Sequence, residues 1–97
     1  MKLVWLPGAI ADLQEIYDSL FERWGAKVAN QFLELVNKTI ARLKSFPLSC
    51  PVVIGKETYR RALIHPNVSL YYKITDEFLY ISSLQFNRQD PENLRLE

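Results

Sequence analysis

The sequence predicts an α+β fold in which an N-terminal strand and an antiparallel helix hairpin precede a three-stranded antiparallel meander. Two observations carry this prediction. Apolar residues recur every three or four positions through the first half of the chain, whereas they alternate with polar residues in the second half. Short turn sequences separate the strands of the second half, so neighbouring strands should pair antiparallel. The helices would then cover one face of the sheet.

A short apolar run opens the chain. Lys2 to Leu6 reads as a strand that joins an edge of the sheet, and Pro7 suits the first position of a helix because that position needs no N–H donor. The apolar stripe of the first helix is Ile10, Leu13, Ile16, Tyr17, Leu20, Phe21 and Trp24. The acidic residues between them, expected to face water or a partner, are Asp12, Glu15, Asp18 and Glu22.

Gly25 is expected to end the first helix, and a second helix should run from about Ala26 to Ser45. Its apolar stripe is Val28, Ala29, Phe32, Leu33, Val36, Ile40 and Leu43. So short a link predicts an antiparallel hairpin. Pro47 ends the second helix, and residues 47–51 form a loop. Nothing in the composition marks a domain boundary, so residues 1–97 are expected to form one domain.

The second half contains three strand candidates. They are Tyr59 to His65, Val68 to Thr75 and Phe78 to Gln85, and Val52 to Ile54 is compatible with a further short extended stretch. Pro66-Asn67 and Asp76-Glu77 are the turns. In the middle strand the face expected to pack on the helices carries Val68, Leu70, Tyr72 and Ile74. The opposite face, expected to be partly open and to carry function, has Ser69, Tyr71 and Lys73.

Composition excludes several classes of function. The net charge is +1, from 12 basic and 11 acidic residues, so binding to nucleic acid would need a local basic cluster. Cys50 is the only cysteine, which excludes an internal disulfide and fits a reducing compartment. No apolar run approaches the roughly 18–20 residues of a membrane span, and no signal peptide is recognisable. We therefore expect a cytoplasmic protein without membrane contact.

Groups that support catalysis are scarce. There is no phosphate-binding loop, dinucleotide fingerprint or zinc spacing, so neither a metal nor a cofactor is predicted. His65, the only histidine, is the candidate general acid or base, although an exposed turn residue is the favoured interpretation. The basic residues of the second half are Lys56, Arg60, Arg61, Lys73 and Arg88, with Tyr59 and Tyr71 among them.

If these basic residues converge, they form a patch that holds phosphate or a carboxylate-rich partner. The alternative is a set of solvated charges paired with neighbouring carboxylates. Arg60 and Arg61 must point to opposite faces of their strand, and one of them should join Lys73. Parity alone does not say which.

Four segments in order carry a family resemblance. They are WLPGAIADLQEIYDSLFERWG, FLELVNKTIARLKSFPLSCP, YRRALIHPNVSLYYKI and YISSLQFNRQDPENL. Together the chain resembles the RelE/ParE superfamily of bacterial toxins from type II toxin–antitoxin systems. Leu6 departs from the polar capping residue that members often place before the proline, which bears on helix stability rather than function.

The resemblance implies one of two mechanisms. The RelE branch comprises ribosome-dependent ribonucleases that cut messenger RNA, whereas the ParE branch poisons DNA gyrase, and a flexible antitoxin segment neutralises both. RelE-like members tend to carry an arginine where this chain has Ser69, and a tyrosine or histidine near the C-terminus, where the residues after Arg88 offer neither. The near-neutral charge also differs from the basic character of the RelE branch.

The resemblance therefore favours a ParE-like toxin that acts by binding, without catalytic residues. Its binding residues, for target or antitoxin, would be Arg60, Arg61, Lys73 and Arg88. Two alternatives stay open. One is a RelE-like endoribonuclease that uses Arg60 or Arg61 with Lys73 and Arg88 against ribosome-bound message. The other is a detoxified homologue that only binds its antitoxin.

Overall fold

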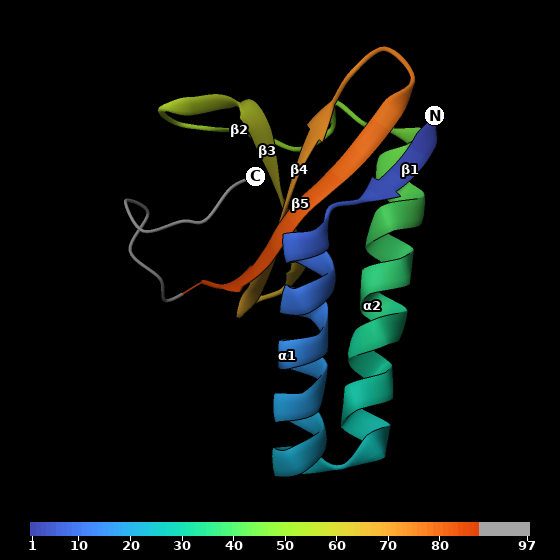
Figure 1. Cartoon of the computed structure of the whole chain (residues 1–97), viewed down its shortest axis with the longest axis vertical. Helices are drawn as coiled ribbons and strands as arrows, with labels where there is room; N and C mark the ends of the chain where they lie inside the picture. The colour runs from blue at the N-terminus through green and yellow to red at the C-terminus, as the bar shows by residue number, and fades with distance from the viewer. Residues whose placement is uncertain (88–97) are drawn as a thin grey trace.

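A helix hairpin packs on one face of a five-stranded sheet (Figure 1). The computed structural model describes residues 1–87, and the structural statements below concern that part of the chain. The elements are β1 (Lys2–Trp5), α1 (Pro7–Trp24), α2 (Ala26–Ser45), β2 (Val52–Val53), β3 (Lys56–His65), β4 (Val68–Ile74) and β5 (Phe78–Phe86). The predicted α+β class and order of elements are confirmed.

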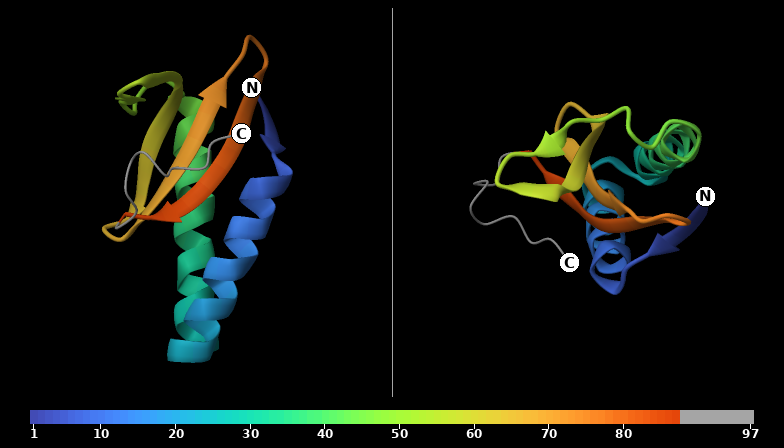
Figure 2. Two further views of the ribbon diagram at one scale, coloured as in Figure 1. Left: turned by 60° about the vertical axis from the view of Figure 1, so that its left-hand side comes forward. Right: turned by 90° about the horizontal axis from the view of Figure 1, so that it is seen from above.

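The strands of the sheet follow the order β1-β5-β4-β3-β2. β1 lies at one edge, as predicted, and pairs parallel with β5 (Figure 2). The other neighbours pair antiparallel, which confirms the meander. The extended stretch at Val52 forms β2, a two-residue strand at the opposite edge.

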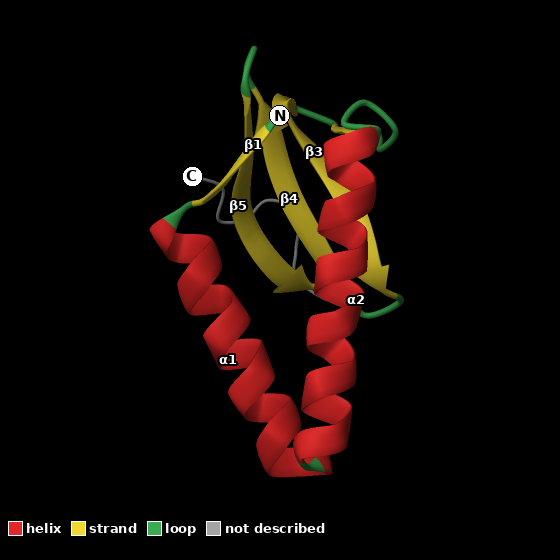
Figure 3. Ribbon diagram, turned by 90° about the vertical axis from the view of Figure 1, so that its right-hand side faces the viewer, coloured by secondary structure: helices red, strands yellow, loops and turns green. Residues whose placement is uncertain are grey.

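A single residue joins the two helices. Gly25 has φ of 88°, a conformation that glycine adopts without strain, and its N–H donates to the Phe21 carbonyl at 2.9 Å. The helices meet there and diverge towards the sheet (Figure 3). The tip of the hairpin projects beyond the sheet (Figure 1).

The core lies between the hairpin and the facing side of the sheet. Its buried helical residues are Ala9, Ile16, Ala29, Phe32, Val36, Ile40 and Leu43. Its buried strand residues are Ala62, Ile64, Val68, Leu70, Tyr72, Leu79, Ile81 and Leu84. Each large apolar side chain buried here stabilises the fold by roughly 1.5–3 kcal/mol. The predicted inward face of β4 and the stripe of α2 are therefore confirmed in the main, although Val28, Leu33 and Ile74 are only half-buried.

The predicted stripe of α1 is partly wrong. Ile10 is 55% exposed and Trp24 is 67% exposed, and Phe21 is also exposed. The buried face of α1 is rotated so that it carries Ala9, Asp12 and Ile16. Phe21 and Trp24 lie near the projecting tip of the hairpin, where the sheet does not reach to cover them.

Asp12 was expected to face water, but it is only 8% exposed. Its Oδ2 accepts a hydrogen bond of 3.1 Å from the backbone N–H of Leu84 in β5. β1 pairs with β5 only from Phe78 to Ile81, so Leu84 lies past the end of that ladder. The carboxylate of Asp12 thus gives the Leu84 N–H an acceptor that β1 does not provide. The burial of Asp12 is tolerated because its carboxylate is hydrogen-bonded.

The membrane prediction concerns the two helices. Neither α1 nor α2, the helices of residues 1–87, combines the length and apolar character needed to cross a bilayer.

Candidate functional site

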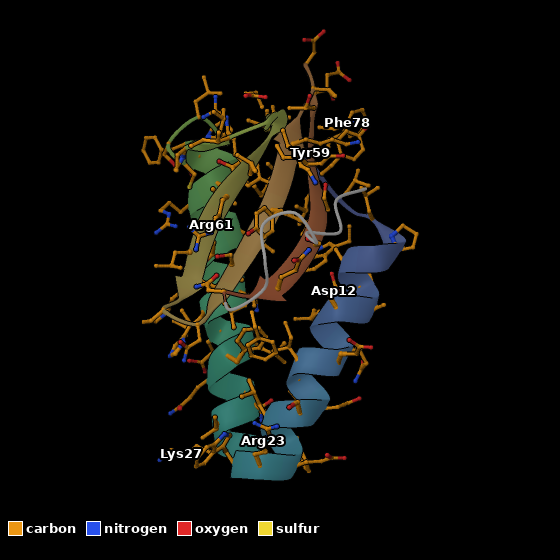
Figure 4. The ribbon with its side chains drawn as sticks, turned by 90° about the vertical axis from the view of Figure 1, so that its left-hand side faces the viewer. Asp12, Arg23, Lys27, Tyr59, Arg61 and Phe78 are labelled. Carbon is orange, nitrogen blue, oxygen red and sulfur yellow. The ribbon has the colours of Figure 1, made fainter. Side chains whose placement is uncertain are left out.

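The candidate site lies on the side of the sheet that faces away from the helices, called here the outer face (Figure 4). Its side chains are Tyr59, Arg61, Ser69, Tyr71, Lys73, Phe78, Tyr80, Ser83 and Gln85. They lie in rows across the strands because Tyr59 pairs with Lys73, and Arg61 pairs with Tyr71. Side chains two residues apart on a strand are separated by roughly 7 Å, so the rows of Arg61 and Lys73 are neighbours.

Arg61, and not Arg60, joins Lys73 on the outer face. Arg60 lies opposite Tyr72, a core residue, and therefore points to the helix side of the sheet. Its Nη1 donates to the carbonyl of Cys50 at 2.6 Å and more weakly to that of Leu48 at 3.4 Å. The charge of Arg60 is thus used to hold the loop of residues 47–51 against β3.

Arg61 is fixed by a chain of polar side chains. Its Nε–H donates to the Oγ of Ser69 at 2.8 Å. The hydroxyl of Ser69 donates in turn to Oδ1 of Asn87, and Nδ2 of Asn87 donates to the carbonyl of Pro66 at 2.6 Å. These contacts place Arg61 beside Ser69, the position at which the RelE-like pattern would have an arginine.

The prediction of a partly open face is wrong at two positions. Ser69 and Tyr71 are buried, whereas Lys73 is half-buried. The physical reason is that polar side chains here bond to one another across strands, as Arg61 does with Ser69. Within β5, Gln85 donates to Ser83 at 3.0 Å.

Lys73 lies between two aromatic rings. Its ammonium is 5.7 Å from the ring centre of Tyr59 and 5.6 Å from that of Tyr80, both within cation–π range. Phe78 extends this aromatic row, and Lys2 from β1 lies over its ring at 5.9 Å. In residues 1–87, neither Arg61 nor Lys73 has a carboxylate within ion-pairing distance. No carboxylate of the described residues therefore neutralises their charge.

Arg88, the fourth predicted site residue, lies outside the described residues. His65 is exposed at the β3–β4 turn, where its Nδ1 accepts from the N–H of Asn67 at 3.2 Å. It lines an apolar hollow of about 200 Å³ beside Phe32, on the helix side of the sheet. His65 therefore does not join Arg61 on the outer face.

Two groups behind the site are structural. Burial raises the pKa of the Tyr72 phenol well above its ordinary value, and the phenol donates to the carbonyl of Pro47 at 2.8 Å. Cys50 is half-buried in the adjoining loop. Within residues 1–87, no cluster of histidine, cysteine and acidic residues is arranged to hold a metal ion.

Sequence reasoning missed Asn87 and Arg42. Asn87 follows β5, and Arg42 lies in the last turn of α2, yet both line a hollow of about 830 Å³ together with Arg61. The sequence pattern did not single out Arg42, because only the packing of α2 against β3 brings it to the same hollow as Arg61. No motif marks Asn87.

Comparison with known proteins gives one family match. A family model described as the ParE toxin of the type II toxin–antitoxin system, parDE, matches residues 3–91. A search of curated protein sequences gives no match.

Several solved structures share the fold. A chain of the chromosomal ParDE system from P. aeruginosa has a TM-score of 0.76 at 18% identity, covering 89% of this chain and 95% of that one. A YoeB/ParE toxin from Agrobacterium tumefaciens has a TM-score of 0.65 at 18% identity, covering 90% and 99%. YafQ from E. coli has a TM-score of 0.60 at 18% identity, covering 89% and 92%.

Proposed function

This chain belongs to the ParE toxin family of type II toxin–antitoxin systems, and from that membership we propose that it inhibits DNA gyrase by binding and that a cognate antitoxin neutralises it. Such a toxin would act in the cytoplasm, where gyrase is found. The surroundings of Ser69 are the observation that favours gyrase binding over RNA cleavage. Arg61 reaches this position, but no described residue beside it is placed to transfer protons to a substrate.

Cleavage of RNA by 2′-hydroxyl attack needs a proton acceptor and a group that stabilises the developing charge. Arg61 has the charge for the second role. For the first, His65 lies on the helix side, and Tyr71 is only 5% exposed, so a substrate would not reach its hydroxyl. Losing a proton-transfer group typically lowers a rate by about 10²–10⁴. These features support binding rather than ribonuclease activity.

An antitoxin suits the same surface. Arg61 and Lys73 are not ion-paired with any described residue, and a negatively charged protein segment would neutralise them. Leu35 and Phe86, exposed apolar side chains at the small hollow on the helix side, offer further area to a segment that continues around the sheet. A segment that is disordered when free would bury this area upon binding.

The test uses the purified chain in two assays run side by side. One measures supercoiling by gyrase and the accumulation of gyrase–DNA breaks. The other maps cuts in ribosome-bound message by primer extension. We expect inhibition of gyrase and no specific cuts, with both toxicity in cells and gyrase inhibition reversed by the product of the adjacent antitoxin gene.

Specific cuts in the ribosomal A site that vanish in the Arg88→Ala variant would overturn the proposal and establish the ribonuclease alternative. A chain that binds the antitoxin but inhibits neither gyrase nor translation would be a detoxified homologue, which also contradicts the proposal. An Arg23→Ala variant is the control for charge removal, because Arg23 lies at the tip of the hairpin, far from Arg61 (Figure 4).

A further inference from the structure

Arg61 is oriented before any ligand arrives. Ser69, which accepts from its Nε–H, is fully buried and also bonded to Asn87. Asn87 is held in turn, since its backbone N–H donates to the carbonyl of Asn67 at 2.9 Å and its Nδ2 donates to that of Pro66. The guanidinium is therefore tied to the β3–β4 turn, and binding an anion would cost it little side-chain entropy.

Within residues 1–87, most donors of this guanidinium have no partner. Arginine offers five N–H donors in a planar fork, and only Nε–H of Arg61 is engaged among residues 1–87. The four N–H groups on its two terminal nitrogens match the two oxygens of a carboxylate or phosphate.

A second guanidinium lies at the same hollow. Arg42 from α2 and Arg61 from β3 both line it, as do Pro51, Leu63 and Pro66. No acidic residue is among its lining residues in the described part of the chain. Two cations that no carboxylate of residues 1–87 neutralises make this hollow a site for a ligand with more than one negative group.

Leu63, which also lines the hollow, lies on a part of the β3 edge with which no described strand pairs. β2 pairs with β3 no further than Arg60, and the N–H of Arg61 donates to the carbonyl of Pro51 at 3.1 Å. Backbone groups two residues apart on a strand point the same way. The N–H and C=O of Leu63 therefore also point away from β4, in the plane of the sheet and past the end of β2. Leu63 itself is 52% exposed. A strand edge that no described residue pairs with can accept an added extended chain.

From these observations we infer that an extended acidic segment of a protein partner binds along β3 at Leu63, with its carboxylates on Arg61 and Arg42. Ser69 and Asn87 act as positioning residues for Arg61. The combination of backbone edge and cationic fork selects a protein segment over a nucleic acid, because a nucleic acid has no backbone donors and acceptors spaced to pair with a strand. The inference rests on the proposed function, in which the partner is the antitoxin.

The test is a titration of the ¹⁵N-labelled full chain with a capped hexaglutamate peptide, followed by NMR. Inorganic phosphate, a thymidine hexanucleotide and capped hexaglutamine are titrated separately. We expect hexaglutamate to shift the Leu63 amide and the Arg61 Nε–H signals together. Phosphate should shift only the arginine signal, and hexaglutamine neither. Tighter binding of the oligonucleotide than of hexaglutamate at these signals, or no shift with hexaglutamate, would overturn the inference.

Substitutions distinguish a role of Ser69 in positioning Arg61 from a general effect on folding. Arg61→Ala should weaken binding of hexaglutamate about tenfold, whereas Arg23→Ala, which removes the same charge at the hairpin tip, should leave it unchanged. Ser69→Ala should weaken binding, and Ser69→Thr, which retains the hydroxyl, should restore it. In the Arg61→Ala background, Ser69→Ala should have no further effect, because two residues that act as one unit are not additive.

An additive effect of Ser69→Ala in that background, or equal weakening by Arg23→Ala, would reject the positioning role. The proposed function fails separately. If the chain binds hexaglutamate at these residues but does not inhibit gyrase, the inference is supported and the proposed activity is contradicted. If the chain inhibits gyrase but hexaglutamate shifts neither the Leu63 nor the Arg61 signal, the proposed activity is supported and the inference is contradicted.

Discussion

Replacing Arg60 by alanine should destabilise the fold, while the same replacement of its neighbour Arg61 should leave stability almost unchanged. Arg60 holds the loop of residues 47–51 through the carbonyls of Cys50 and Leu48, at 2.6 Å and 3.4 Å. Arg61 lies on the outer face, where it is exposed and its side chain bonds only the hydroxyl of Ser69 among described residues. The two variants therefore remove equal charge and volume from opposite faces of one strand.

The expected size of the effect follows from these contacts. A hydrogen bond to a charged group contributes about 1.5–3 kcal/mol, and the bond of Arg60 to Cys50 has the distance of a strong one. Because Arg60 is half-exposed and water partly replaces this bond, we expect a loss of about 1–2 kcal/mol for Arg60→Ala. In a domain of this size, that lowers Tm by roughly 4–16 °C. Arg61→Ala should stay within about 0.5 kcal/mol.

The assay is urea unfolding followed by circular dichroism, with thermal melts of the same samples. Arg60→Lys serves as a control, since it keeps the charge but loses the planar fork, and it should fall between the parent chain and Arg60→Ala. Equal destabilisation by Arg60→Ala and Arg61→Ala, or no effect of Arg60→Ala, would refute the assignment of the two arginines to opposite faces.

Three other variants test the core and its polar contacts. Phe32→Ala should cost roughly 3–5 kcal/mol in urea unfolding because the ring is buried, and Leu33→Ala, at a half-buried position, should cost less than half of that; equal costs would contradict the core assignment. Tyr72→Phe should cost about 1 kcal/mol, because the carbonyl of Pro47 loses its donor. The raised pKa of the Tyr72 phenol also adds stability that is fully present below pH about 10 and is lost as the pH rises towards the folded pKa. The parent chain should therefore lose more stability between pH 9 and 11 than Tyr72→Phe, and parallel losses would argue against this. Asp12→Ala should cost about 1–3 kcal/mol and speed hydrogen exchange at the Leu84 amide, and unchanged exchange would show that Asp12 does not hold that N–H.

Helix boundaries were predictable because local chemistry sets them. Pro7 begins α1, Gly25 separates the two helices, and α2 ends at Ser45, before Pro47. Strand ends were less predictable. β3 begins at Lys56 rather than Tyr59, because Lys56 pairs with Val53 of β2, a contact that exists only in the folded sheet. The two-residue β2 itself has too few residues to show a strand pattern.

The burial of Asp12 and the exposure of Ile10 share one cause. Helical periodicity shows that α1 has an apolar side, but the angle at which that side meets the sheet depends on the position of β5. The need of the Leu84 N–H for an acceptor turns Asp12 inward. The pattern of charged and apolar residues along α1 cannot show that the Leu84 N–H, 72 positions further along the chain, needs a side chain as its acceptor.

The side on which Arg61 lies is decided by packing, not by its own strand pattern. β3 carries apolar residues on both parities, with Ala62 and Ile64 on one and Tyr59 and Leu63 on the other. The helix side takes Ala62 and Ile64, which are buried against the hairpin, so Arg61 and Leu63 must face outward. Arg60 shares the inward parity, but it lies near the edge, where the carbonyls of the loop of residues 47–51 satisfy its charge. A slip of one residue in the register of β3 would exchange the two arginines, placing Arg61 among apolar side chains without these carbonyls. The core thus fixes which arginine is presented to a partner.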